Sequence, residues 1–124
     1  MKRLALLALL FAHPAVAAGC DGLAGTEQMR IELLFGRVAP AAWQAFLASD
    51  VTPAFPDGLT VLNGNGQWRN GRGVITREAS TVVLIIAPRA EDLVTRLNAI
   101  RDSYKKRFHQ ESVGLVIAPV CASF

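Results

Sequence analysis

A continuous apolar run at residues 82–87, rich in β-branched side chains and followed by Pro88, is the clearest hydrophobic feature of the chain. A run of this length and composition is typical of a strand that is buried on both faces. It ends a longer extended segment, residues 74–87, whose first half is polar. We therefore expect this segment to form the centre of a sheet around which the other elements are arranged.

Alternation and turn residues predict three further strands. Apolar and polar positions alternate over residues 29–35, which predicts a first strand with one strongly apolar face. Residues 59–69 predict a second strand, which the glycine-rich Asn63–Gly66 run is expected to interrupt with a bend or bulge. The Asn70-Gly71 pair predicts the hairpin turn into the central strand, and residues 112–118 predict the last strand.

Two helices are predicted from apolar residues at helical spacing. The first runs over residues 40–51, with Pro40 at its first position and Pro53 ending it. The second follows Pro88, with Glu91 and Asp92 in its first turn, and Leu93, Leu97, Ile100, Tyr104 and Phe108 form its apolar stripe. The basic cluster at residues 105–107 is interpreted as the complement of the helix dipole rather than as a binding patch.

The element order is strand, helix, strand, strand, helix, strand, which is the split-βαβ pattern of the ferredoxin-like folds. We therefore expect an α+β sandwich, with both helices on one face of a four-stranded antiparallel sheet. Right-handed crossovers are expected to place the first and third strands side by side and parallel in the middle. The first and last strands are expected to be antiparallel neighbours.

The N-terminal residues predict a secretory signal peptide. Lys2 and Arg3 precede an apolar stretch that is too short to span a bilayer, and small residues at positions 16–18 suit cleavage. Loss of residues 1–18 from the 124 residues of the chain leaves 106, residues 19–124, enough for one domain. It also reduces 13 Lys and Arg to 11, against 10 Asp and Glu, so no nucleic-acid partner is implied. No later stretch is long enough to span a membrane.

Several short motifs of the remaining chain occur together in one known family. They are Leu34-Phe35-Gly36-Arg37, Trp43 with Phe46, Val51-Thr52-Pro53, Phe55-Pro56-Asp57-Gly58-Leu59-Thr60, Gly66-Gln67-Trp68-Arg69, Arg77-Glu78, Tyr104, Phe108, Gln110-Glu111-Ser112-Val113 and Cys121. With this combination the chain resembles domain-of-unknown-function family 3574, a group of small exported bacterial proteins. The resemblance implies export and a single small domain, and it implies no particular activity.

Metal and nucleophile chemistry have little support in the composition. After the signal peptide the chain has one histidine, His109, and two cysteines near its ends, so no cluster with metal-ligand spacing exists. His109 is expected to be a surface residue at a helix end. The glycines of residues 64–73 lack the spacing of a phosphate-binding loop and are interpreted as hairpin residues. No metal or cofactor is predicted.

A polar group on the hairpin and the neighbouring loops is the main candidate for function. It consists of Arg37 at the end of the first strand, Arg69, Arg77, Glu78 and Ser80 on the hairpin strands, and Gln110-Glu111-Ser112 before the last strand, with Trp68 as an aromatic wall. The predicted binding residues among them are Arg37, Trp68, Arg69, Arg77 and Glu111. Arginines beside an exposed tryptophan suit a carboxylate or phosphate ligand, so we expect a non-catalytic binding module for a small anionic ligand or an envelope partner. The structural alternative is that these residues only make cross-strand pairs and tie down a loop. Two other functions remain open: an enzyme with an Arg/Glu/Tyr site in a sheet cleft, and a structural or assembly subunit of the envelope.

Cys20 and Cys121 are predicted to form a disulfide. The predicted fold brings the entry of the first strand and the exit of the last to the same end of the sheet, and the chain is expected in the periplasm or outside the cell, where disulfides persist. The alternative is that Ala17-Ala18-Gly19-Cys20 is a lipoprotein processing site and that Cys20 carries a lipid anchor. The leucine-like residue usual at its first position is missing.

The central strand also predicts a partner. Both alternating sets of side chains in residues 82–87 are apolar, and two helices can cover only one of them. An uncovered apolar patch of a few hundred Å² is large for a monomer. We therefore expect the helix-free face to be covered, either by a second subunit in a homodimer or by the terminal segments of the chain itself.

Overall fold

The computed structural model describes residues 19–124 of the chain. Its elements follow the predicted order: β1 (Thr26–Gly36), α1 (Pro40–Phe46), β2 (Thr60–Arg69), β3 (Ile75–Ala87), α2 (Leu93–Phe108) and β4 (Gly114–Ala122). The helical path of α1 continues through a wider turn at Leu47–Val51 and a tight turn at Thr52–Ala54. The predicted signal peptide, residues 1–18, lies outside the described residues.

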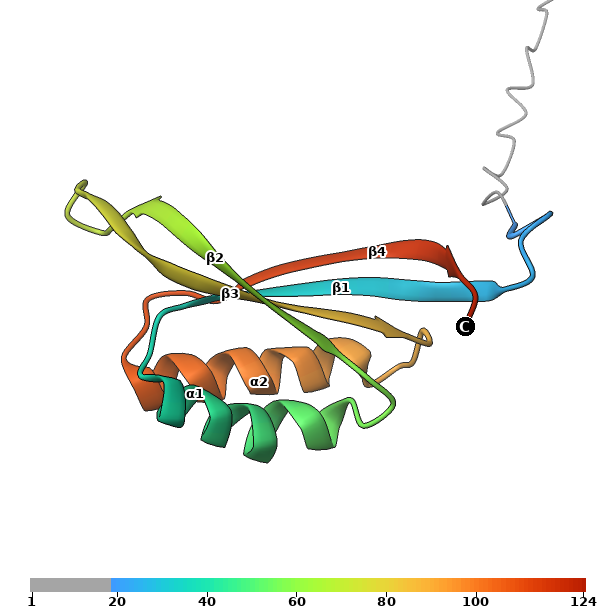
Figure 1. Cartoon of the computed structure of the whole chain (residues 1–124), viewed down its shortest axis with the longest axis horizontal. Helices are drawn as coiled ribbons and strands as arrows, with labels where there is room; N and C mark the ends of the chain where they lie inside the picture. Colours follow the sequence, from blue (N-terminus) through green and yellow to red (C-terminus); the bar gives the residue numbers. More distant parts are fainter. Residues whose placement is uncertain (1–18) are drawn as a thin grey trace, which may run out of the picture.

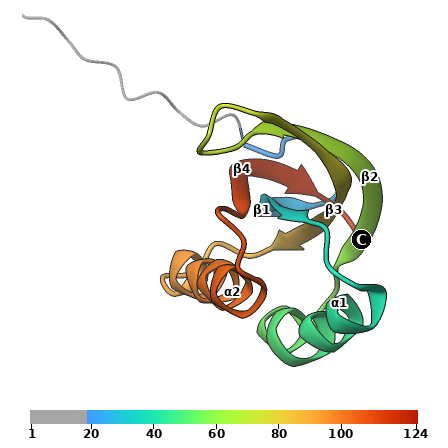
Figure 2. The ribbon, with the colours of Figure 1, turned by 90° about the vertical axis from the view of Figure 1, so that its left-hand side faces the viewer.

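The four strands form one sheet in the order β2-β3-β1-β4, and every neighbouring pair is antiparallel. Both helices lie side by side on one face of the sheet (Figures 1 and 2). The predicted ferredoxin-like α+β sandwich is therefore confirmed. Among the described residues, neither helix is long and apolar enough to cross a membrane.

The expectation that the first and third strands are parallel is wrong. β1 and β3 are neighbours, as predicted, but they pair antiparallel, with Ile31 opposite Ile85. The crossover through α1 makes β2 parallel to β1, and the following hairpin reverses the chain again. β3 must therefore run against β1.

The start of the second helix differs from the expectation, since α2 begins at Leu93, with Asp92 as its N-cap and Glu91 before it, so neither lies in its first turn.

Three local expectations about the hairpin and the last strand also need correction. β2 continues unbroken through Asn63–Gly66, which keep a regular register with β3. The turn spans residues 70–74 rather than Asn70-Gly71 alone, and the positive φ of 80° falls on Gly73. β4 extends to Ala122, so Cys121 lies within a strand, because pairing with β1 continues as far as Thr26.

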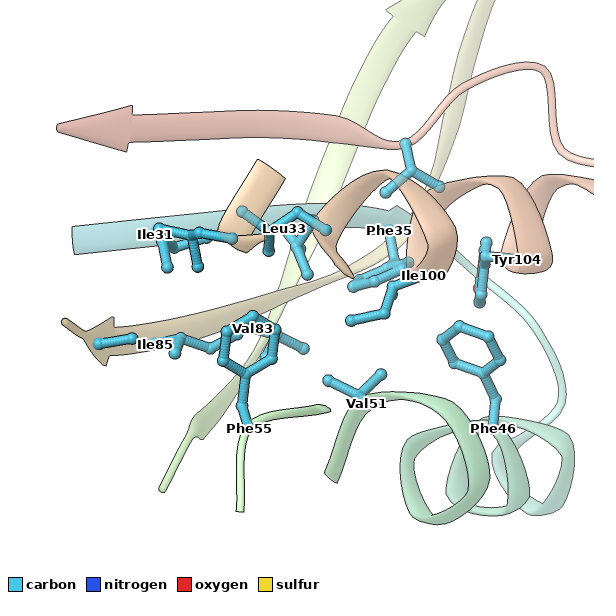
Figure 3. Close-up of a cluster of buried hydrophobic side chains, with 14 of the residues drawn as sticks. Ile31, Leu33, Phe35, Phe46, Val51, Phe55, Val83, Ile85, Ile100 and Tyr104 are labelled. Atoms are coloured by element: carbon cyan, nitrogen blue, oxygen red, sulfur yellow. The ribbon is translucent and has the colours of Figure 1, made fainter. Parts of the chain in front are cut away.

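The core lies between the sheet and the helices (Figure 3). Ile31, Leu33 and Phe35 of β1 point into it, as predicted, and meet the buried side chains of both helices. Those helical side chains are Trp43, Phe46, Leu93, Leu97, Ile100 and Tyr104. Phe35 and Tyr104 pack edge to face, with their ring centroids 4.7 Å apart.

The disulfide between Cys20 and Cys121 is present. It joins the segment before β1 to the end of β4, with a Cα–Cα distance of 5.5 Å across 101 positions of sequence. Both ends of the domain therefore lie at the same end of the sheet, on the right in Figure 1. Disulfides are typical of oxidising compartments.

The β2–β3 hairpin extends beyond the rest of the sheet. β1 stops pairing with β3 at Gly36, opposite Ser80, whereas β2 and β3 pair on as far as Arg69 and Ile75. We call this two-stranded extension, residues 65–79, the hairpin arm. It twists over the side of the sheet that carries no helix (Figure 2).

Candidate functional site

A cavity of about 350 Å³ lies at the base of the hairpin arm, on the helix-free side of the sheet. We call it the arm pocket. Its lining residues are Leu34, Phe35 and Gly36 of β1, Gly66, Gln67 and Trp68 of β2, Glu78, Ser80, Thr81 and Val82 of β3, and Gln110, Glu111, Ser112 and Gly114 at the entry to β4.

Small residues create the hollow. A Cβ on Gly36 would lie 2.7 Å from Oε1 of Gln110 and 3.0 Å from Oε1 of Glu78, and one on Gly114 would lie 2.9 Å from Cδ1 of Leu34. A side chain at either position would displace these neighbours. Glycine at the end of β1 therefore lets Glu78 and Gln110 approach the backbone at the inner end of the pocket.

Glu78 and Trp68 form the polar centre of the pocket. The register places Trp68 opposite Thr76 and Gly66 opposite Glu78. The side chains of Trp68 and Glu78 therefore both project to the helix-free side. The indole Nε1–H of Trp68 donates a 2.9 Å hydrogen bond to Oε1 of the half-buried Glu78. One carboxylate oxygen is thus oriented by the protein, and the other remains available to a ligand.

Tyr104 lies on the core side of the sheet, below the end of β1 at which Glu78 lines the pocket. Its hydroxyl donates a 2.7 Å hydrogen bond to the carbonyl oxygen of Gly36. Burial, with a smaller contribution from the negative charge of Glu78, raises the pKa of Tyr104 to about 12. The phenol is therefore protonated at neutral pH and supports the end of β1.

The charge of the pocket is negative. Glu78 and Glu111 both line it, and none of the described residues of the lining is basic. The Glu111 carboxylate also reaches the hairpin turn, since a Cβ on Gly71 would lie 3.8 Å from its Oε2. The remaining lining of Leu34, Val82 and the Trp68 ring is apolar.

The five predicted binding residues separate into three places. Trp68 and Glu111 line the arm pocket. Arg37 lines a second cavity of about 340 Å³ on the helix side of the same part of the sheet, with Trp43, Gln44, Asn63 and Thr81. Arg69 and Arg77 line neither of these cavities. Both are exposed on the other side of the hairpin arm from Trp68.

The register of the hairpin explains this separation. Trp68 and Arg69 are strand neighbours and therefore point to opposite faces. The five-residue turn pairs Arg77 with Gln67, which puts Arg77 on the Arg69 side and leaves Glu78 beside Trp68. A two-residue turn at Asn70-Gly71 would shift the register by an odd number and bring Arg77 to the Trp68 side.

Glu78, Ser80 and Gln110 line the pocket; they belong to the predicted polar group but were not among the five predicted binding residues. A partial signal exists, because Glu78, Ser80 and Val82 share one parity along β3 and therefore one face. Gln110 carries no such signal, because its position depends on how the loop after α2 packs. That loop begins at His109, an exposed residue at the helix end, as expected. Within residues 19–124 no group of acidic, histidine or cysteine side chains is arranged to hold a metal ion.

The sequence of this domain decides its family. Residues 27–124 match the family described as "Protein of unknown function (DUF3574)", which is nearly the whole of the described chain. The chain belongs to this family. The predicted resemblance is therefore confirmed for all of the domain except its first residues. No curated protein matches the sequence.

Solved structures with a similar fold share little sequence with this family member. A phage SAM lyase in complex with S-methyl-5'-thioadenosine is 16% identical, with a TM-score of 0.60 over 77% of this chain and 90% of that one. CutA from Synechococcus elongatus, complexed with Bis-Tris, is 14% identical, with a TM-score of 0.52 over 80% and 87%.

A nitrogen regulatory PII-like protein from Thiomonas intermedia, bound to ADP, AMP and bicarbonate, is 14% identical, with a TM-score of 0.50 over 82% and 100%. At this level of identity the likeness shows the fold alone.

Proposed function

We propose that the protein is an exported, non-catalytic binding module whose arm pocket receives a small organic ligand with a positive charge. The observation that carries this proposal is the lining: apolar side chains, an indole wall and two carboxylates, with no basic residue among the described lining. A cation there gains a charge-assisted hydrogen bond to Glu78 and a cation–π contact with Trp68. The volume of about 350 Å³ lies at the lower end of the range for small-molecule sites.

An anionic ligand, as predicted from the arginines, needs a different place. The second cavity, beside Arg37, offers a guanidinium with the polar side chains of Gln44, Asn63 and Thr81. These groups can donate hydrogen bonds to a carboxylate or phosphate. An anionic ligand in that cavity stays a prediction, and an envelope partner remains an alternative to a small molecule.

The proposed module is non-catalytic because Tyr104 and the arginines are not placed to act on a ligand in the arm pocket. A phenol with a pKa of about 12 is a weak acid at neutral pH, and Tyr104 is fully buried with its hydroxyl already bonded to Gly36. The rival enzyme needs Arg, Glu and Tyr around one substrate. Glu78 and Tyr104 lie near each other, but Arg37, Arg69 and Arg77 do not line the arm pocket.

The charge of the ligand is tested with a matched pair of probes, benzylamine and benzoate, measured by calorimetry on the purified protein. We expect benzylamine to bind and benzoate to bind at least about tenfold more weakly, since one charge-assisted hydrogen bond is worth about 1.4 kcal/mol or more. The Glu78→Gln variant should lose this preference, because its amide oxygen can still accept the indole hydrogen bond but carries no charge.

Arg77→Gln is the control, because it changes the neighbouring residue of the same strand on the opposite face. Its affinity for benzylamine should equal that of the unmodified protein. A preference for benzoate that is lost in Arg37→Ala, or in the Arg69→Ala/Arg77→Ala double variant, would establish the anionic ligand instead. Binding of neither probe would contradict a small-ligand function for the arm pocket.

Export and self-association complete the proposed function. The signal-like N-terminus and the Cys20–Cys121 disulfide support a periplasmic or secreted protein. The apolar side chains of the helix-free face support a homodimer formed through that face. If the ligand is absent and the face pairs with another envelope protein, the chain is a structural or assembly subunit, which is the second candidate function.

A further inference from the structure

An apolar stripe crosses all four strands on the helix-free face. Its members are Leu34, Leu62, Val82, Leu84 and Val116. The register places Leu62 opposite Val82 and Val82 opposite Leu34, while Leu84 and Val116 flank Glu32 from either side. Leu34, Leu62 and Val116 are 41%, 51% and 50% exposed. Such a stripe on a described domain of 106 residues indicates a surface that another molecule covers.

The described terminal segments do not cover the stripe. The disulfide holds Cys20 against Cys121 at the far end of the sheet from the hairpin arm (Figure 1). Phe124, the last residue, is fully exposed there. The described residues of the same chain therefore leave the stripe open to another molecule.

The charges on the face select the occupant. Arg30 and Glu32 are both on this side of β1 and form an ion pair with a 2.8 Å separation of Nη2 and Oε1. This pair offers one charge of each sign beside the stripe, which an occupant with an apolar surface and charges of both signs would complement. A second copy of this face does so, because a twofold axis can place Arg30 of each copy against Glu32 of the other.

The stripe is continuous with the arm pocket. Leu34 and Val82 belong to the stripe and also line the pocket, so the pocket opens onto the surface that the second copy would cover. We propose that a second copy docks on the stripe and closes the open side of the arm pocket, so that the pocket is complete only in the oligomer. The role of this closure in ligand binding rests on the function proposed above, whereas the docking of the second copy does not.

The test needs no ligand, because Trp68 lies in the pocket and reports on its closure. The chain has two tryptophans, and the other, Trp43, is only 8% exposed in the core. Sedimentation velocity measures self-association of the purified protein over micromolar to millimolar concentrations, and acrylamide quenching of fluorescence is measured at the same concentrations. We expect a dissociation constant tighter than about 1 mM. We expect quenching of the Trp68 signal to fall by about threefold or more in the oligomer.

Leu62→Glu should abolish both effects, because Leu62 belongs to the stripe but not to the pocket lining. Val94→Glu is the matched control: Val94 is 53% exposed on α2, in the helix layer, and its change should alter neither. Trp68→Phe assigns the quenched signal. A monomer at millimolar concentration, or an oligomer in which Trp68 stays equally quenchable, would overturn the proposal.

Benzylamine then separates this proposal from the proposed function. Where closure and binding are coupled, benzylamine should tighten self-association of the unmodified protein and bind more weakly to Leu62→Glu. If the protein self-associates with protection of Trp68 but benzylamine does not change the association constant, the cationic ligand is contradicted and the docking proposal is retained. Equal binding by the monomeric variant would contradict the coupling and leave the ligand standing.

Discussion

Tyr104 shows how one side chain serves the core and the pocket together. Its ring packs against Phe35 and Phe46, and its hydroxyl holds the carbonyl of Gly36, where β1 ends and the arm pocket begins. Glu78 lies on the pocket side of the same point. The carboxylate can therefore approach the backbone only because residue 36 has no side chain and the strand end is fixed from below.

The raised pKa of Tyr104 predicts a loss of stability at alkaline pH. An unfolded tyrosine ionises near pH 10, and the folded pKa is about 12, so folding favours the protonated form. This contribution is complete below pH 10 and decreases as the pH rises through 12. A difference of two pKa units corresponds to at most about 3 kcal/mol.

The measurement is simple because Tyr104 is the only tyrosine of the chain. Ultraviolet absorbance of tyrosinate should give a midpoint well above 10 in the folded protein. The Tyr104→Phe variant should lose about 1–3 kcal/mol at neutral pH, because the Gly36 carbonyl loses its donor. Its free energy of unfolding should also lack the decrease between pH 10 and 12 that ionisation of Tyr104 causes. A titration midpoint near 10 would mean that the hydroxyl reaches solvent.

Among the elements, α2 ends at a residue whose backbone conformation is strained for any side chain with a Cβ. His109 closes the helix in the left-handed conformation, with φ of 53° and ψ of 37°. Its backbone N–H donates to the carbonyl of Lys105, as does that of Gln110. Glycine is the usual residue at such a position, because a Cβ is strained there.

We therefore predict that His109→Gly stabilises the protein by about 0.5–1 kcal/mol in urea unfolding. His109→Ala keeps the Cβ and should give no such gain, which separates the backbone strain from any effect of the imidazole. Equal gains from the two variants would show that the imidazole itself is unfavourable.

At the scale of the whole molecule, the disulfide closes a loop of nearly the entire domain. Cys20 and Cys121 are 101 positions apart. In the chain-entropy model a loop of about 100 residues contributes about 4–5 kcal/mol. We expect the Cys20→Ser/Cys121→Ser variant to be destabilised by up to this amount in denaturant unfolding.

Intact mass of the protein from exporting cells provides the check on the bond itself. The disulfide predicts a mass two hydrogens below that of the reduced chain, and no alkylation before reduction. A lipid on Cys20 would need the same sulfur, so an added diacylglycerol, or two free thiols, would contradict this pairing.

The sequence by itself determined the elements and their order. Alternation in β1, the stripe of α2, and the apolar run of β3 each report a local periodicity, and local periodicity follows from which face of an element is buried. Those elements in that order leave few topologies, so the ferredoxin-like sandwich, the core and the Cys20–Cys121 pair were predictable. The motifs also indicated the family.

The tertiary structure decided which side chains share a site. Turn length sets the register of a hairpin, and a change of one residue exchanges its two faces. Glycine stands at both positions 71 and 73, so the sequence alone left both turn lengths open and could not choose between Arg77 and Glu78 as the neighbour of Trp68. The position of Gln110 depended on loop packing. The sign of the charge in the pocket, and hence the class of ligand proposed for it, is therefore a property of the fold and not of any one segment.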